Sequence, residues 1–152
     1  MGTTAACIYA TIYYAYHERK TLLPKYKNNL LFFKRLINDT FGIWKPSDDP
    51  NAWKNFKEHL SFGILELEVE EHTTSANFLD LMISINKYSK INTRTYQKEM
   101  NLYLYLPPTS SHPLSVMRGM IYGMLIKYDE QNSHRKHYLE MIVLLFRRLA
   151  TR

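Results

Sequence analysis

The stretch Leu31–Trp44 reads LFFKRLINDTFGIW and places two apolar runs on either side of one short polar pair. Residues 30–37 are typical of a β-strand, and residues 40–44 are typical of the strand that returns beside it. Asn38 and Asp39 lie between the two runs, and both residue types tolerate the backbone angles that tight hairpin turns demand. We therefore predict a β-hairpin that carries the Asp39 carboxylate at the tip of its turn.

Helices are predicted on both sides of this hairpin. Residues 3–19 are apolar on almost every side, which is typical of a buried helix, and residues 22–29 are predicted to form a loop. After the hairpin, the acidic residues and proline of SDDP at 47–50 predict a helix start. The helix should cover residues 51–61, because one helical stripe there comprises Trp53, Phe56 and Leu60.

Three strands are predicted after this helix. Residues 64–70 alternate apolar residues with glutamates, as in a strand with one face in water. Residues 78–85 and 91–97 are typical of two further strands, and we expect these two to pair because only a short turn separates them. Asp80 could be taken as a catalytic carboxylate, but a carboxylate that is partly buried or lies at the edge of its strand is the favoured interpretation.

The chain changes to helical periodicity after Pro113. Two apolar stripes lie on either side of a polar break at residues 131–133. The first comprises Met117, Ile121, Met124, Leu125 and Tyr128, and the second comprises Tyr138, Met141, Ile142, Leu145 and Leu149. The pattern predicts an α+β fold in two parts: an antiparallel sheet with packed helices at residues 1–106, and a helix-turn-helix hairpin at residues 107–152.

The composition is that of a globular protein, with 45% hydrophobic and 22% charged residues among 152. The single cysteine excludes an internal disulfide and a four-cysteine zinc site. Residues 1–16 are too short for a membrane span and too rich in tyrosine for a secretory signal. We therefore expect a soluble intracellular protein with no membrane partner. Its net charge of +6 is compatible with binding nucleic acid, although charge alone leaves this open.

Four stretches carry a likeness to a known family: residues 1–18, FKRLINDTF at 33–41, NFLDL at 77–81 and TRTYQK at 93–98, with a His-Pro pair at 112–113. Their order and spacing resemble those of reverse transcriptases of retroelements, closest to the Penelope-like group. The second stretch resembles the catalytic hairpin of the palm, and the two final helices resemble the helix-turn-helix segment that follows this palm. The resemblance implies RNA-templated DNA synthesis on a template-primer, with Mg²⁺ ions held by palm aspartates.

Two departures from the family pattern bear on activity. The family's hairpin tip carries two adjacent aspartates, whereas Asn38 takes the first place here and only Asp39 remains. A neutral amide oxygen is a poor substitute for a carboxylate that bridges two Mg²⁺ ions. The family also needs another catalytic aspartate on an earlier palm strand, which would lie upstream of Met1. Asn38 and Asp39 are thus the catalytic positions and Asp39 the remnant metal ligand, and we expect weak Mg²⁺ binding and no polymerisation by this fragment alone.

Basic side chains are the candidates for contacts with template or primer. Four lie on predicted palm strands and two lie on the last helix. They are Lys34, Arg35, Arg94, Lys98, Arg147 and Arg148. An alternative function is a non-catalytic nucleic-acid-binding module that uses the basic C-terminal helices, and a solvated helix face explains the same helical residues equally well.

Two histidines near the start of the last helix are a further candidate. His134, His137 and Glu140 are spaced to share one helix face, which could hold a metal ion. A solvated helix start is favoured, because His-x-x-His without a distant third ligand is a weak metal signature.

Overall fold

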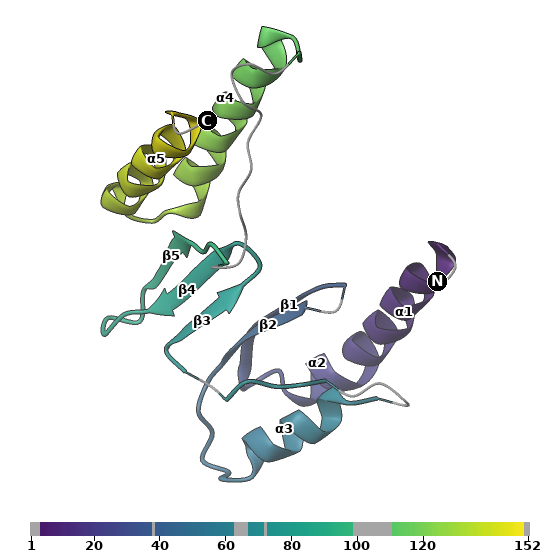
Figure 1. Ribbon diagram of the computed structural model, residues 1–152. Helices are drawn as coiled ribbons and strands as arrows, with labels where there is room; N and C mark the ends of the chain where they lie inside the picture. The colour runs from purple at the N-terminus through teal and green to yellow at the C-terminus, as the bar shows by residue number, and fades with distance from the viewer. Residues whose placement is uncertain (1–3, 38, 63–66, 72, 99–110, 151–152) are drawn as a thin grey trace. The chain divides into compact units, whose positions relative to one another are not determined.

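The computed structural model describes residues 4–37, 39–62, 67–71, 73–98 and 111–150, which form an α+β fold. The chain divides into two compact units, residues 1–72 and residues 73–152 (Figure 1). The second unit groups three strands with the last two helices, whereas the sequence predicted a boundary after residue 106, a position outside the described residues. In the described part of the chain, no helix is long and apolar enough to cross a membrane.

The first unit begins with a continuous helical segment. Helix α1 (Thr4–His17) runs into the π-helical turn η1 (Glu18–Leu22) and the short helix α2 (Leu23–Lys25). The predicted loop at 22–29 is therefore wrong at its start, because residues 22–25, including Pro24, are helical.

The prediction that the first helix is buried is also wrong. Four of its large side chains are 60% to 70% exposed: Ile8, Tyr9, Ile12 and Tyr16. Helix α1 therefore packs with only part of its apolar surface.

The predicted hairpin is confirmed. Strands β1 (Leu30–Leu36) and β2 (Asp39–Trp44) pair antiparallel as a two-stranded sheet, and helix α3 (Ala52–Leu60) follows them. The core of this unit is aromatic: Phe56 of α3 lies with its ring centroid 4.9 Å from that of Trp44 and 5.1 Å from that of Tyr26. Its buried members are Leu22, Tyr26, Phe56 and Leu60.

The strand predicted at residues 64–70 does not form in its described part. Residues 67–71 have no regular secondary structure, and residues 63–66 lie outside the described residues. Leu67 and Val69 instead pack against the aromatic core. Their alternation with glutamates thus reflects a segment with one apolar side and one wet side that pairs with no strand.

The second unit contains a three-stranded antiparallel sheet in the order β3-β4-β5. The strands are β3 (Ser75–Phe78), β4 (Leu81–Ile85) and β5 (Ile91–Thr95). The predicted pairing of the last two strands is confirmed. The single strand predicted at 78–85 is wrong, because a tight turn at Leu79 and Asp80 divides it into the end of β3 and the whole of β4.

The predicted helix-turn-helix hairpin is confirmed as α4 (Leu114–Gln131) and α5 (Arg135–Ala150). The two helices are joined by a short turn at residues 132–134 (Figure 1). Both predicted stripes contribute to one core, in which Tyr128, Met141 and Leu145 are buried.

Candidate functional site

The tip of the β1–β2 hairpin is one residue away from its predicted position. Leu36 pairs with Asp39, so Asp39 is the first residue of β2 and only two positions separate the paired residues. Ile37 has φ 56°, a left-handed conformation that is rare for a β-branched residue. Such strain persists only where surrounding contacts hold it, and it is often found at functional sites. Asn38 itself lies outside the described residues.

Asp39 lies on the exposed face of the hairpin. Directly paired residues share a face and alternate residues return to it, so Asp39 shares its face with Leu36 and Lys34. Both charged residues are exposed. Asp39 forms no ion pair with any residue that the structure describes. The hairpin therefore presents one carboxylate and one ammonium group to solvent on the same side.

Arg35 points to the opposite face and is held inside the first unit. Its Nε donates to Glu18 Oε1 at 2.7 Å, and its two terminal nitrogens donate to the backbone oxygens of Ile37 at 2.9 Å and Thr11 at 3.2 Å. Its guanidinium lies 4.7 Å from the ring centroid of Tyr14. The Arg35 and Glu18 side chains are only 7% and 15% exposed. Arg35 thus fastens the hairpin tip to the first helix.

The π-helical turn η1 supplies the partner of Arg35. Glu18 is the first residue of this turn, and π-helical turns are rare insertions that are frequent at functional sites.

Burial raises the pKa of the neighbouring Tyr14 hydroxyl, against the opposing effect of Arg35. The phenol is therefore neutral at physiological pH, and the Arg35 guanidinium faces one carboxylate, not two anions.

Two predicted nucleic-acid contacts of the second unit are bonded within that unit. Arg94 forms an ion pair with Glu140 at 3.1 Å, and both side chains are about half exposed. Arg148 donates to the Gln97 side-chain oxygen at 3.0 Å. These bonds join strand β5 and the segment after it to helix α5, and they reduce the charge that either arginine presents to a phosphate.

Asp80 lies in the turn between β3 and β4, not at the edge of a strand. Its carboxylate accepts from Lys127 of α4 at 2.6 Å. This exposed pair joins α4 to the turn between β3 and β4. Lys98 and Arg147 are exposed.

The histidines of the helical hairpin form no metal site in the structure. The rings of His134 and His137 lie edge to face with centroids 5.7 Å apart, while Glu140 turns to Arg94. Across the described ranges, no three His, Cys, Asp or Glu side chains come together as metal ligands would.

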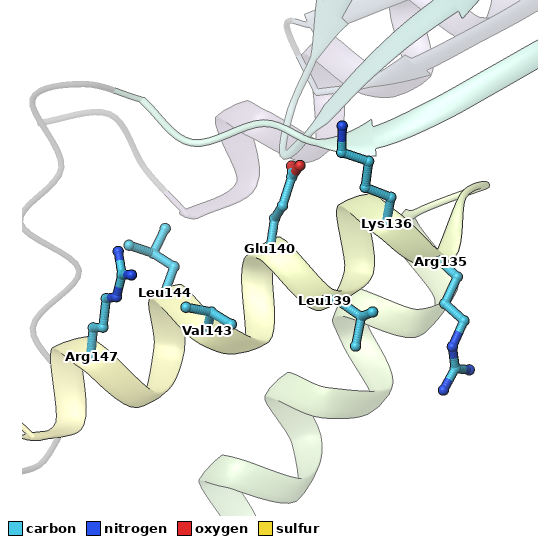
Figure 2. Close-up of a pocket in the computed structure, with 7 residues that line it drawn as sticks. All are labelled: Arg135, Lys136, Leu139, Glu140, Val143, Leu144 and Arg147. Atoms are coloured by element: carbon cyan, nitrogen blue, oxygen red, sulfur yellow. The ribbon is translucent and has the colours of Figure 1, made fainter.

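A shallow hollow runs along α5 (Figure 2). It is lined by side chains of this helix alone, three of them basic: Arg135, Lys136, Leu139, Glu140, Val143, Leu144 and Arg147. Arg135 and Lys136 belong to the basic C-terminal helices that the alternative nucleic-acid-binding function would use. The centre of this surface is apolar, whereas a surface that binds the phosphates of a nucleic acid requires basic or polar side chains.

A polar pocket in the first unit was missed from the sequence. His59 lies at its centre: Nε2 accepts from Lys25 Nζ at 2.6 Å, and Nδ1 contacts the Asn55 backbone oxygen at 2.5 Å and Tyr26 Oη at 3.1 Å. Burial raises the pKa of the Tyr26 hydroxyl, and the Glu58 carboxylate adds to the rise. These residues come from α2 and the turn that follows it, and from α3, which is far from them in sequence, so no local motif indicates them.

Comparison of the chain with protein-family models, with curated proteins and with solved structures found no match.

Proposed function

We propose that this chain is a reverse-transcriptase-derived palm segment in which the β1–β2 hairpin is the counterpart of the catalytic hairpin. The register of that hairpin carries the proposal, because it puts an exposed carboxylate, Asp39, on the first residue after a two-residue turn. The order of helix, hairpin, helix, antiparallel strands and helical hairpin is compatible with a palm followed by a thumb-like segment.

The residues of the hairpin do not fit a pair of Mg²⁺ ions. Two-metal catalysis holds cations about 4 Å apart with anionic oxygens, and Asp39 is the only acidic residue between Leu30 and Trp44. Glu18, the carboxylate behind the hairpin, is bonded to Arg35. Among the described residues ahead of β1, residues 4–25 are helical and 26–29 form turns, so none of them supplies a palm strand. The proposed role of Asp39 is that of a single, weak ligand for a divalent cation.

Primer extension tests this proposal directly. On an RNA template with Mg²⁺ or Mn²⁺, we expect no extension by the chain alone, and none after Asn38→Asp, because one turn still offers too few carboxylates. Robust extension by either protein would contradict the proposed inactivity.

Cation binding tests the ancestry of the tip separately. Mn²⁺ binding, measured by electron paramagnetic resonance, should be weak in the unaltered chain. The affinity for Mn²⁺ should be higher in Asn38→Asp and lower in Asp39→Asn than in the unaltered chain. The matched control is Asp48→Asn, which removes an exposed carboxylate outside the hairpin. Equal binding by Asp39→Asn and the unaltered chain would sink the assignment of Asp39.

A second candidate function is a non-catalytic nucleic-acid-binding module, favoured by the three basic residues along the hollow of α5. Phosphate contacts make affinity fall steeply with salt, with a slope of about 0.7 to 0.9 per contact. Lys136→Ala should lower that slope by about one contact, whereas Lys127→Ala should not, because Lys127 is paired with Asp80. Salt-independent binding, or no binding, would count against this candidate.

A further inference from the structure

Helix α4 leaves one apolar face without a partner among the residues of its unit that the structure describes. Tyr122 is 68% exposed and Ile126 is 42% exposed, and both lie on the side of α4 away from Tyr128, which packs against α5. A Cβ atom added at Gly119 or Gly123 on this side would meet no atom within 4 Å. Another helix could therefore approach this part of α4 closely. We call this surface the α4 face; Asp129 and Glu130 extend it toward the turn.

Helix α5 has a corresponding exposed face. Leu139, Val143 and Phe146 follow one another at spacings of four and three and are 47%, 50% and 53% exposed. They lie opposite Met141 and Leu145, which are buried against α4. Figure 2 shows Leu139 and Val143 on this helix with Arg135 and Lys136 at its start. We call this surface the α5 face.

The two faces are complementary when their helices run antiparallel. Ile126, Tyr122 and Gly119 then meet Leu139, Val143 and Phe146 in that order, because both series are spaced by four and then three residues. The largest side chain of the α5 face, Phe146, is opposite a glycine. At the other end, the acidic pair Asp129 and Glu130 meets the basic pair Arg135 and Lys136.

We propose that a second copy of this chain docks its α4 face on the α5 face of the first. The two faces lie on opposite sides of the helical hairpin, since each is turned away from the core that joins α4 and α5. One copy therefore cannot satisfy its own faces, and the contact is heterologous: each added copy leaves one new face open. Association should be concentration-dependent and continue beyond the dimer.

A protein helix fits the α5 face better than a polynucleotide does. The middle of the face is three half-exposed apolar side chains, which gain from burial against other apolar groups. A phosphate backbone would instead select a row of cations, and Arg94 and Arg148 of the same unit are bonded to Glu140 and Gln97.

Analytical ultracentrifugation of the full chain tests the proposal. The weight-average mass should rise with concentration from the monomer value of 18.1 kDa. Val143→Glu/Phe146→Glu and Tyr122→Glu/Ile126→Glu should each remain at the monomer mass, with unchanged far-ultraviolet circular dichroism. Mixed together, the two variants retain one intact α4 face and one intact α5 face, so they should form a 1:1 dimer and stop there.

Charge reversal tests the acidic and basic ends. Arg135→Glu/Lys136→Glu should lose association, and adding the partner variant Asp129→Lys/Glu130→Lys should restore it. The matched control is Ile8→Glu/Ile12→Glu on the exposed side of α1, which should associate as the unaltered chain does.

Three results would overturn the proposal. The first is a chain that stays monomeric at every concentration. This result would overturn the proposal even if the chain bound RNA through the α5 face. The second is association that survives both face variants or is abolished by the α1 control. The third is a mixture of face variants that stays monomeric, because one variant still supplies an intact α4 face and the other an intact α5 face, and the proposed contact requires these two faces to pair.

Discussion

Arg35 joins the β1–β2 hairpin to the first helical segment through several contacts. Its guanidinium is shared among the Glu18 carboxylate, the backbone oxygens of Thr11 and Ile37, and the ring of Tyr14. The bond to Ile37 lies at the strained residue of the turn. Arg35 therefore supports the conformation that presents Asp39, although it does not face the same side.

We expect Arg35→Met to destabilise the first unit by roughly 3–5 kcal/mol, because it leaves the mostly buried Glu18 carboxylate without its cation. Urea unfolding followed by tryptophan fluorescence measures this, since Trp44 and Trp53 both lie in the first unit. The neighbour Lys34 is exposed, so Lys34→Met should cost no more than about 0.5 kcal/mol. Equal costs for the two variants would contradict the role given to Arg35.

The raised pKa of Tyr26 predicts a loss of stability in alkali. Burial raises the pKa of Tyr26 in the folded state above its ordinary value of 10.0, so the unfolded chain gives up its phenolic proton first as pH rises. Stability is therefore retained below pH 10 and declines as pH rises through the folded-state pKa. Tyr26→Phe should flatten this decline in fluorescence-monitored urea unfolding. The exposed Tyr88 gives the control, and a decline of unchanged slope in Tyr26→Phe would refute the attribution.

Local patterns predicted the elements whose signals are local. The β1–β2 hairpin and the α4 and α5 helices were found because their apolar residues follow strand or helix spacing over their own length. The prediction of a single strand at 78–85 was wrong because the turn within it contains Leu79, at φ 55°, and not the glycine or asparagine that normally marks such a turn. Residues 67–70 alternate like a strand, but their apolar side chains pack on an aromatic core. That outcome depends on distant residues.

Strand β5 and the α4–α5 turn are joined by a buried amide. Asn132 Oδ1 accepts from the Thr95 backbone N–H at 3.0 Å, and Asn132 Nδ2 donates to Thr95 Oγ1 at 2.8 Å and to the Tyr128 backbone oxygen at 2.7 Å. Both Asn132 and Thr95 are buried. This arrangement holds the helical hairpin against the sheet.

We expect Asn132→Ala to destabilise the second unit by about 2–4 kcal/mol, because it leaves several buried polar groups without partners. Thermal unfolding followed by circular dichroism measures the effect. Ser133 bonds Thr93 at an exposed position, so Ser133→Ala should cost only about 0.5–1.5 kcal/mol. If Asn132→Ala unfolded at the same temperature as Ser133→Ala, the buried amide would have no special role.

At the scale of the whole molecule, the sequence predicted which segment carries the candidate site but not the contacts that this segment makes with other elements. The sequence predicted that Asp39 lies in a hairpin, and in the structure Asp39 is the first residue of β2. It did not find the Arg35–Glu18 pair or the Lys25–His59 contact, because each joins residues from separate elements. The grouping of β3–β5 with the last two helices likewise follows from contacts between side chains such as Lys127 and Asp80.

Each unit has its own buried cluster, so we expect the two units to unfold in separable transitions. Phe56→Ala should lower the stability reported by tryptophan fluorescence by about 3–5 kcal/mol and leave the remaining helical signal of the second unit in place. Leu145→Ala should do the reverse, lowering the helical transition by about 2–5 kcal/mol without moving the fluorescence midpoint, because the second unit contains no tryptophan. Urea titrations that record fluorescence and far-ultraviolet circular dichroism on the same samples make the comparison. If either substitution shifted both signals equally, the two cores would unfold as one cooperative structure, and loss of the first unit would then expose the helical hairpin as well.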